Sequence, residues 1–205
     1  MSLLRHWPLL LGAGFLAAVW SGPLVRLSAI SFTAHMALHL ALVLVAAPLL
    51  ALGLARAGML RGVRFGAGVA LAFSLIEMLA VWSWHAPALH AAAALRPVPF
   101  ALQQASFLGA GLLVWLPGLA DRSRAGAAAG ALALAASFTH MTMLGVLLTI
   151  APGQIYAPGL CGGAFGLDAL SDQRLGGALM AVIGGLVYMA GAVWFAAGLL
   201  REGDD

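Results

Sequence analysis

Long runs of apolar residues dominate this chain and restrict its fold more than any other feature. A helix that crosses the hydrocarbon core of a bilayer needs roughly 20 predominantly apolar residues, and a helix satisfies its own backbone hydrogen bonds there. The sequence therefore predicts an all-α polytopic integral membrane protein, a bundle of about six transmembrane helices forming a single membrane domain over residues 1–205. We expect the helices near 7–21, 29–54, 65–84, 100–119, 126–150 and 176–200.

The composition supports this class and excludes others. Only 8% of the 205 residues are charged and 63% are hydrophobic, whereas a soluble domain is about 25% charged. The net charge of +3 is too small to indicate a nucleic-acid partner; lipid is the expected surrounding. Cys161 is the only cysteine, which excludes a disulfide within the chain.

Arginines in the loops predict the orientation, because basic loops tend to stay in the cytoplasm. Three arginines, Arg26, Arg96 and Arg174, are expected on the outer side of the membrane, and a larger set of seven on the cytoplasmic side. This arrangement predicts cytoplasmic termini, a retained first helix rather than a cleaved signal peptide, and outer loops at 84–99 and 151–175. The larger set, expected on the cytoplasmic side, is Arg5, Arg56, Arg61, Arg64, Arg122, Arg124 and Arg201.

Polar residues occur inside three of the apolar stretches, where they are costly. His35 and His39 lie in the second stretch, Glu77 in the third and His140 in the fifth. At 1.5 Å per helical residue, all four fall roughly 8–15 Å below the same membrane face. Ionisable groups at such depths usually pair with one another or mark an ion or proton pathway. We therefore expect them to form one site.

The spacing and the donor types indicate a copper site. His35 and His39 are four residues apart and His140 and Met143 three apart, so each pair shares a helix face. Imidazole suits copper, and thioether favours Cu(I). The expected ligands are His35, His39 and His140 with Met36 or Met143, while Glu77 neutralises charge or orients a histidine and His85 lies on the route of access.

Other interpretations of these residues remain open. The histidines and Glu77 are also compatible with hydrogen bonds between helices, and the methionines with ordinary packing. Paired histidines near the outer face can ligate haem, and Glu77 can serve a proton or ion pathway. His90 is interpreted as a loop histidine at the membrane interface, and Asp172 with Gln173 as the cap of the last helix.

An ordered set of short motifs resembles the multi-spanning CtaG-like cytochrome c oxidase assembly factors, from about residue 29 to the C-terminus. The motifs are His35-Met36-Ala37-Leu38-His39, Pro48-Leu49-Leu50 with Gly53, Trp84-His85-Ala86-Pro87, Ser106-Phe107-Leu108 with Gly111 and Trp115, Gly145, Ile155-Tyr156, and Asp172-Gln173-Arg174-Leu175-Gly176-Gly177.

The resemblance implies a protein of the bacterial inner membrane that supports maturation of a respiratory haem–copper oxidase, and that handles copper rather than acting as an enzyme. Its expected partners are oxidase subunits or copper chaperones. In one departure, Gln103-Gln104 stands where the family usually has a histidine, which removes a candidate ligand. A non-catalytic accessory subunit of a respiratory complex is therefore the main alternative, with a haem-binding membrane protein as another.

Overall fold

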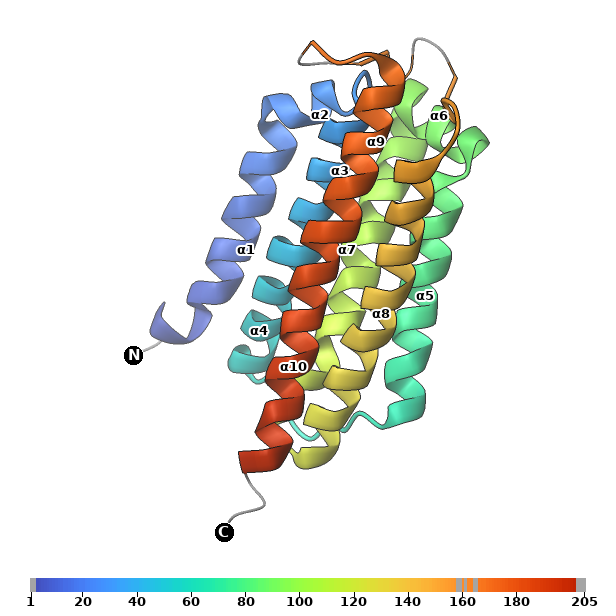
Figure 1. Cartoon of the computed structure of the whole chain (residues 1–205). Coiled ribbons are helices and arrows are strands. Elements are labelled where there is room, and N and C mark those ends of the chain that lie inside the picture. Colours follow the sequence, from blue (N-terminus) through green and yellow to red (C-terminus); the bar gives the residue numbers. More distant parts are fainter. Residues whose placement is uncertain (1–2, 158–159, 161, 164–165, 202–205) are drawn as a thin grey trace.

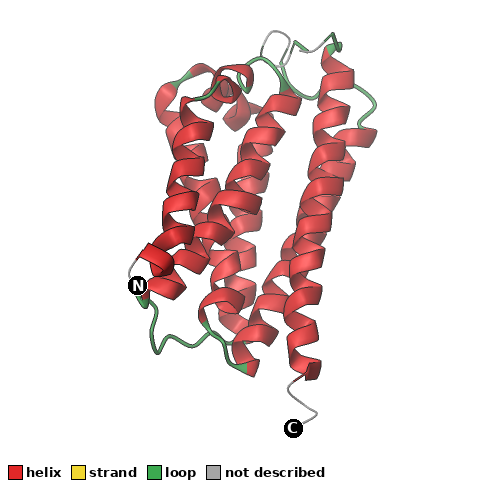
Figure 2. Ribbon diagram, turned by 90° about the vertical axis from the view of Figure 1, so that its left-hand side faces the viewer, coloured by secondary structure: helices red, strands yellow, loops and turns green. Residues whose placement is uncertain are grey.

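The chain is described by a computed structural model that covers residues 3–157, 160, 162–163 and 166–201. These residues form helices and connecting segments and contain no β-strand (Figure 2). The predicted all-α class is confirmed. The elements are α1 (Leu3–Ser21), α2 (Pro23–Leu27), α3 (Phe32–Ala41), the π-helical turn η1 (Leu42–Ala46), α4 (Ala47–Ala57), α5 (Ala67–His85), α6 (Pro87–Leu95), α7 (Pro97–Ala120), α8 (Arg124–Ile150), α9 (Ala169–Leu179), the π-helical turn η2 (Met180–Gly184) and α10 (Gly185–Arg201).

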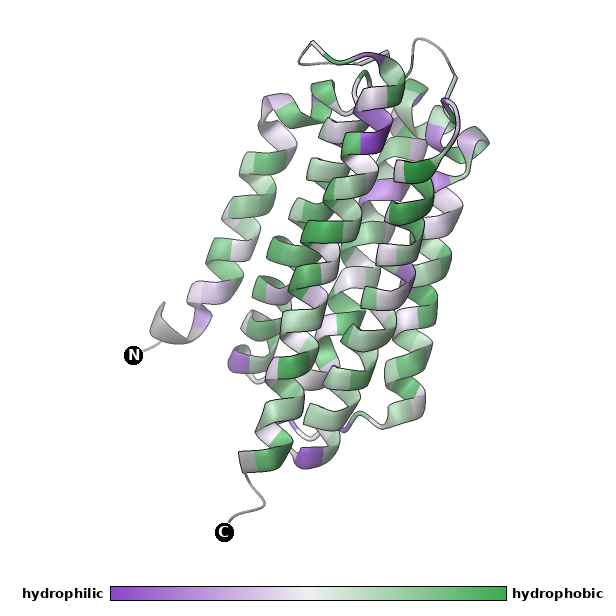
Figure 3. Cartoon of the chain, viewed as in Figure 1, coloured by the Kyte–Doolittle hydropathy of each residue, from purple (hydrophilic) through white to green (hydrophobic). Residues whose placement is uncertain are grey.

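The helices stand side by side in one bundle, and α1 begins at the end where α10 stops (Figure 1). Apolar residues cover most of its outside (Figure 3). Among the described residues, five helices are long and apolar enough to cross a membrane, so the chain is a multi-pass membrane protein. The first apolar helix, His6–Ser21, is shorter. The five are Phe32–Ala57, Ala67–His85, Pro97–Ala120, Arg124–Ile150 and Ala169–Leu200.

The second apolar stretch is one helix from Phe32 to Ala57 that passes through Pro48. Proline lacks an N–H and normally breaks the hydrogen-bond ladder. The chain widens into the π-helical turn just before Pro48, where the Ala47 N–H donates to the Leu42 carbonyl. The indole N–H of Trp115 donates to the next carbonyl, that of Val43, at 2.9 Å. A side chain from α7 therefore replaces the missing backbone donor.

The last long helix begins at Ala169 rather than near residue 176, and its cap is not the expected one. Asp168 caps it by accepting a hydrogen bond from the Ser171 N–H at 2.9 Å. Asp172 lies inside the first turn and is fully buried. Its carboxylate instead accepts hydrogen bonds from the backbone of α3, at Phe32 (2.6 Å) and Thr33 (3.2 Å). The prediction that Asp172 caps its own helix is wrong.

The connection between α5 and α7 is also more ordered than expected. A short helix, α6, occupies Pro87–Leu95 in what was predicted as a loop. Pro87 and Pro97 each stand in the first turn of a helix, where proline needs no hydrogen-bond partner for its nitrogen. As a result, the chain turns inward after α5 and places His90 inside the bundle. Cys161, in the connection between α8 and α9, lies outside the described residues.

Candidate functional site

Four histidines come together at the end of the bundle that carries α2 and α6. His35 and His39 come from α3, His85 from the last turn of α5, and His90 from α6. Ring centroids are 4.7 Å apart for His35 and His90, 5.6 Å for His35 and His85, and 5.8 Å for His39 and His85. Each residue is at most 5% exposed. We call these residues the histidine cluster.

Aromatic rings enclose the histidine cluster. Phe107 of α7 lies 4.2 Å from the His39 ring, centroid to centroid, and Tyr156 lies 4.3 Å from His90. Phe32 stacks on Tyr156 at 4.7 Å. The Tyr156 hydroxyl donates to the His85 carbonyl at 3.1 Å. This hydrogen bond ties the connection between α8 and α9 to the end of α5. The imidazoles therefore face an apolar shell rather than water.

Several imidazole nitrogens in this shell have no hydrogen-bond partner among the described residues. They are Nε2 of His35, Nε2 of His85 and both ring nitrogens of His39. His85 contacts the Val81 carbonyl through Nδ1 at 2.6 Å, which favours a proton on Nδ1 and leaves a lone pair on Nε2. Buried polar atoms are nearly always satisfied in folded proteins, so this group is exceptional.

In the histidine cluster, the surroundings of His90 favour the neutral form of its imidazole. Burial, reinforced by the nearby His85, lowers the pKa of His90 to about 3. A neutral imidazole is the form that binds a metal ion. Sequence reasoning favoured a loop position for His90 over a ligand on the route of metal entry, and did not place it inside the bundle. The signal it overlooked is the pair Pro87 and Pro97, which bracket an apolar segment long enough for a helix.

A second polar group lies next to the histidine cluster and is built on Glu77 of α5. Tyr188 of α10 and Ser137 of α8 each donate a short hydrogen bond to its carboxylate. The Nε2 atom of His140 lies 3.4 Å from Glu77 Oε2. His140 is also close enough to His39 for the two to interact electrostatically. Glu77 is fully buried, so its carboxylate lies inside the bundle beside His140.

The two candidate methionines have different surroundings. Met36 is fully buried, and its Cγ lies near Gly176 of α9, where an added Cβ would come within 3.2 Å of it. Met143 is 48% exposed on the outside of the bundle. The structure therefore brings His35, His39, His85, Glu77 and His140 into one region and leaves Met143 outside it.

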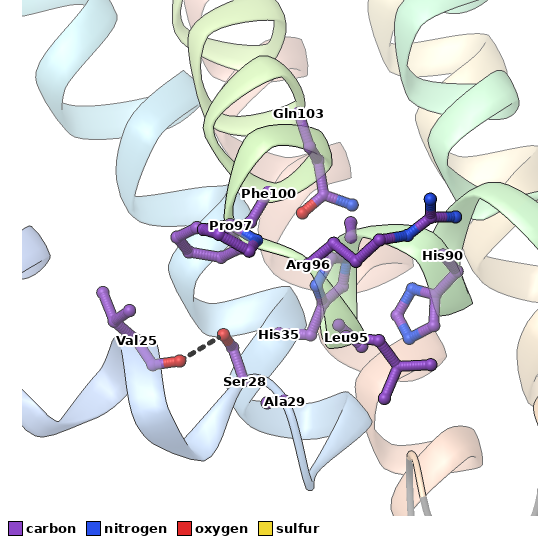
Figure 4. A pocket seen from close by; sticks show the side chains of 12 residues that line it. Val25, Ser28, Ala29, His35, His90, Leu95, Arg96, Pro97, Phe100 and Gln103 are labelled. Atoms are coloured by element: carbon purple, nitrogen blue, oxygen red, sulfur yellow. Dashed lines mark hydrogen bonds between the residues drawn. The ribbon is translucent and has the colours of Figure 1, made fainter.

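A cavity of about 190 Å³ adjoins the histidine cluster between α2, α6 and α7 (Figure 4). His35 and His90 line it together with Gln103, and Val25 and Phe100 form the opposite side. The side-chain nitrogen of Gln103 has no hydrogen-bond partner. Arg96 also lines the cavity. The cavity gives a small ligand a direct path to the imidazoles.

The conformation described is not that of an assembled metal centre. Within the described residues, no three His, Cys, Asp or Glu side chains are placed to hold a metal ion together. The histidine rings contact edge to face instead, at interplanar angles of 73° (His35 and His85), 77° (His35 and His90) and 69° (His39 and His85). Bringing their nitrogens to one point requires rotation of the side chains.

Comparison with known proteins identifies the family. The family model described as cytochrome c oxidase caa3 assembly factor (Caa3_CtaG) matches residues 1–202. No curated protein and no solved structure matches the chain. The resemblance carried by the sequence motifs is confirmed and extends through α1. The chain belongs to the family of cytochrome c oxidase caa3 assembly factors.

Proposed function

We propose that this protein supports cytochrome c oxidase assembly by holding Cu(I) at the histidine cluster and passing it to an oxidase subunit or a copper chaperone. The observation that carries the proposal is the set of buried imidazole nitrogens without partners, at His35, His39 and His85. Leaving such groups unpaired costs stability in the absence of a ligand. Binding and release of an ion involve no covalent step, so we propose an assembly factor that is not an enzyme.

The spacing of the rings fits a shared metal ion. With metal–nitrogen bonds of about 2 Å, two imidazoles on one ion have ring centroids roughly 5–6 Å apart. The observed centroid distances run from 4.7 Å to 5.8 Å. We expect rotation of these rings, rather than movement of α3, α5 or α6, to bring their nitrogens to one ion.

The charge beside the histidine cluster favours a monovalent ion. Neutral imidazoles add no charge, and the carboxylate of Glu77 lies 3.4 Å from Nε2 of His140, which in turn interacts with His39. A buried cation is stable only when an opposite charge or good hydrogen bonds offset it. One carboxylate balances Cu(I), whereas a divalent ion would leave an excess positive charge. Charge balance therefore supports Cu(I), and the exposed Met143 is not needed as a ligand.

The arginines support an orientation with the histidine cluster at the outer face of the bacterial inner membrane. Arg26, Arg96 and Arg174 belong to the end that contains α2 and α6. The opposite end holds more arginines, which favours the cytoplasm, and α1 begins and α10 ends there (Figure 1). Copper would then arrive from outside through the cavity lined by His35 and His90. The arginines described at the cytoplasmic end are Arg56, Arg61, Arg64, Arg122 and Arg124.

The test is copper binding by protein purified in mild detergent under reducing conditions. We expect one Cu(I) per chain, measured by metal analysis and by competition with a chromogenic Cu(I) chelator. The His35→Ala/His39→Ala double variant should lose it. The matched control is His6→Ala, because His6 is exposed on α1 at the other end of the bundle. Full copper binding by the double variant would refute the proposed site.

The same sample distinguishes the alternatives. A Soret band in its visible spectrum would assign the histidines to haem. The cavity of about 190 Å³ beside them is smaller than the roughly 300–1,000 Å³ typical of small-molecule sites, which favours an ion instead. Absence of both copper and haem after Cu(I) loading would favour a non-catalytic accessory subunit.

A further inference from the structure

The side-chain amide of Gln103 lies at the cavity beside His35 with a donor that nothing accepts from. Gln103 is 1% exposed and lines the cavity, and its amide is turned from α7 toward the other lining residues (Figure 4). Its side-chain nitrogen has no hydrogen-bond partner among the described residues. Because a buried donor without an acceptor costs free energy, the cavity is suited to a ligand that supplies an acceptor.

Hydrogen bonds that start at α1 determine the orientation of the Gln103 amide. An indole N–H can only donate, and that of Trp20 donates to the side-chain oxygen of Gln104 at 3.4 Å. The Gln104 nitrogen is then directed at the Gln103 oxygen, to which it donates at 3.4 Å. Since the Gln103 oxygen is engaged in this way, its N–H groups are left for the cavity. The site therefore selects a ligand atom that accepts a hydrogen bond.

Arg96 adds a positive charge to the same cavity. It stands at the start of α7, is exposed, and lines the cavity together with Gln103. The acids of α9 are engaged elsewhere: Asp168 accepts from the Ser171 N–H, and Asp172 from the start of α3. A hydrogen bond is strongest when its acceptor is ionised and its donor carries a positive charge. The combination of Gln103 and Arg96 therefore favours an anionic acceptor.

The walls of the cavity favour one class of anion. Val25, Ala93 and Phe100 line it with apolar groups. A carboxylate has about four acceptor positions, and its burial against apolar walls is costly unless they are satisfied. Sulfur, by contrast, is tolerated by apolar surroundings, and thiolate is a soft ligand that selects Cu(I). Because His35 is both a wall of this cavity and a proposed copper ligand, a thiolate that carries Cu(I) fits best.

We propose that the cavity receives the thiolate of an incoming Cu(I) carrier, whose sulfur accepts a hydrogen bond from Gln103 and faces Arg96 while the copper meets His35. The inference rests on the proposed copper function. In the transfer, the copper–sulfur bond of the carrier breaks and a bond from copper to the unpartnered Nε2 of His35 forms. Copper stays Cu(I), and the thiolate leaves with the bonding electron pair. Gln103 and Arg96 stabilise that leaving anion, so they control the rate of transfer more than the final copper affinity.

The test compares copper uptake from the Cu(I)–glutathione complex, whose ligand is a thiolate, with uptake from the Cu(I)–acetonitrile complex, whose ligands are neutral. Full-length protein in mild detergent is mixed with each complex without oxygen, and copper outside the protein is trapped at set times with a chromogenic chelator. We expect Gln103→Leu and Arg96→Gln each to slow uptake from the glutathione complex about tenfold, the scale of one lost hydrogen bond to a charged group. Uptake from the acetonitrile complex should remain nearly unchanged.

Arg26→Gln is the matched control for the charge of Arg96. Arg26 is exposed on α2, at the same end of the bundle, and stands outside the residues that line the cavity. We expect it to take up copper from both complexes at the rate of the wild type. If Gln103→Leu does not fold, the exposed Arg96→Gln carries the test.

Different outcomes overturn this inference and the proposed copper function. If the wild type takes up no copper from either complex, both are refuted. Normal uptake by the wild type with unchanged rates in Gln103→Leu and Arg96→Gln refutes thiolate docking alone. Equal slowing in Arg26→Gln would also refute it, because general charge attraction would then explain the effect. Acetate that inhibits uptake from the glutathione complex in the wild type but not in Arg96→Gln would assign the cavity to carboxylates instead.

Discussion

Asp172 of α9 accepts a hydrogen bond from the backbone N–H of Phe32, the first residue of α3, at 2.6 Å. The same carboxylate accepts from the Ser31 hydroxyl at 2.8 Å, and Ser31 in turn caps α3 by accepting from the Ala34 N–H. A negative charge at a helix N-terminus offsets the helix dipole. The last helix thereby holds the start of the helix that carries His35 and His39.

Replacing Asp172 with alanine should destabilise the protein strongly. The substitution leaves the N–H groups of Phe32 and Thr33 and the Ser31 hydroxyl without their acceptor inside the bundle. We expect a loss of about 3 kcal/mol, which for a chain of this size lowers the melting temperature by roughly 6–12 °C. Thermal unfolding in detergent, followed by circular dichroism, measures the change.

Asp168→Ala is the matched control for that experiment. Asp168 is exposed and caps only its own helix, through Ser171. We expect a clearly smaller shift in melting temperature and unchanged Cu(I) binding. If the two variants melted at the same temperature, the link between α9 and α3 would not be a main support of the histidine cluster.

Much of the fold follows from local patterns, whereas the details of the site do not. Apolar length alone locates the membrane helices, and the spacing of His35 and His39 places both on one face of α3. His90 requires knowledge that α6 folds back over the end of the bundle. The partner of Asp172 is 140 residues away in sequence, at Phe32, and only the packed bundle reveals it.

The methionines show a second limit of pattern reading. Met36 is adjacent to His35 in sequence, but neighbouring residues on a helix point about 100° apart. That rotation directs Met36 toward Gly176 of α9. Depth in the membrane was a sound guide to which residues share a layer. It carried no information about which way each side chain points within that layer.

Glu77→Gln should weaken Cu(I) binding if the carboxylate offsets the charge of the ion. Glutamine keeps the size of the side chain and one acceptor oxygen but removes the negative charge. We expect the dissociation constant to rise at least about tenfold, equivalent to about 1.4 kcal/mol. Competition against a Cu(I) chelator at constant pH measures it.

Tyr188→Phe is the control for the charge effect. It removes one hydrogen bond to Glu77 and keeps the carboxylate. We expect lower thermal stability, by about 1–3 kcal/mol for a buried acceptor that loses its donor, but a smaller change in copper affinity than in Glu77→Gln. The reverse order of the two affinities would count against charge balance.

The opposite end of the bundle should show acid sensitivity through Asp121. Although burial favours the protonated acid, hydrogen bonds from Ser123 and Phe65 and the charge of Arg64 lower the pKa of Asp121 below its ordinary value of 3.8. A carboxyl whose pKa is lower in the folded state stabilises the fold above the unfolded pKa and loses that contribution as the pH falls through the folded pKa. The stabilisation is therefore present at neutral pH and lost below about pH 4.

Melting temperatures of wild type and Asp121→Asn measured from pH 7 to pH 3 test this sign. We expect the variant to melt several degrees lower at pH 7 and the difference to shrink toward pH 3. Arg64→Gln should reproduce only part of the loss, because the Ser123 and Phe65 hydrogen bonds remain. A constant difference across the pH range would show that Asp121 acts through packing and not through its charge.

Trp115→Phe tests how the second membrane helix passes Pro48. Without the indole N–H, the Val43 carbonyl loses its donor at 2.9 Å, and Pro48 has no N–H to replace it. A buried acceptor left unpaired costs about 1–3 kcal/mol, so the melting temperature should fall by roughly 2–12 °C. Trp20→Phe is the control, because Trp20 is 42% exposed and its hydrogen bond to Gln104 is longer, at 3.4 Å. Equal stability of the two variants would mean that the π-helical turn supports itself without α7.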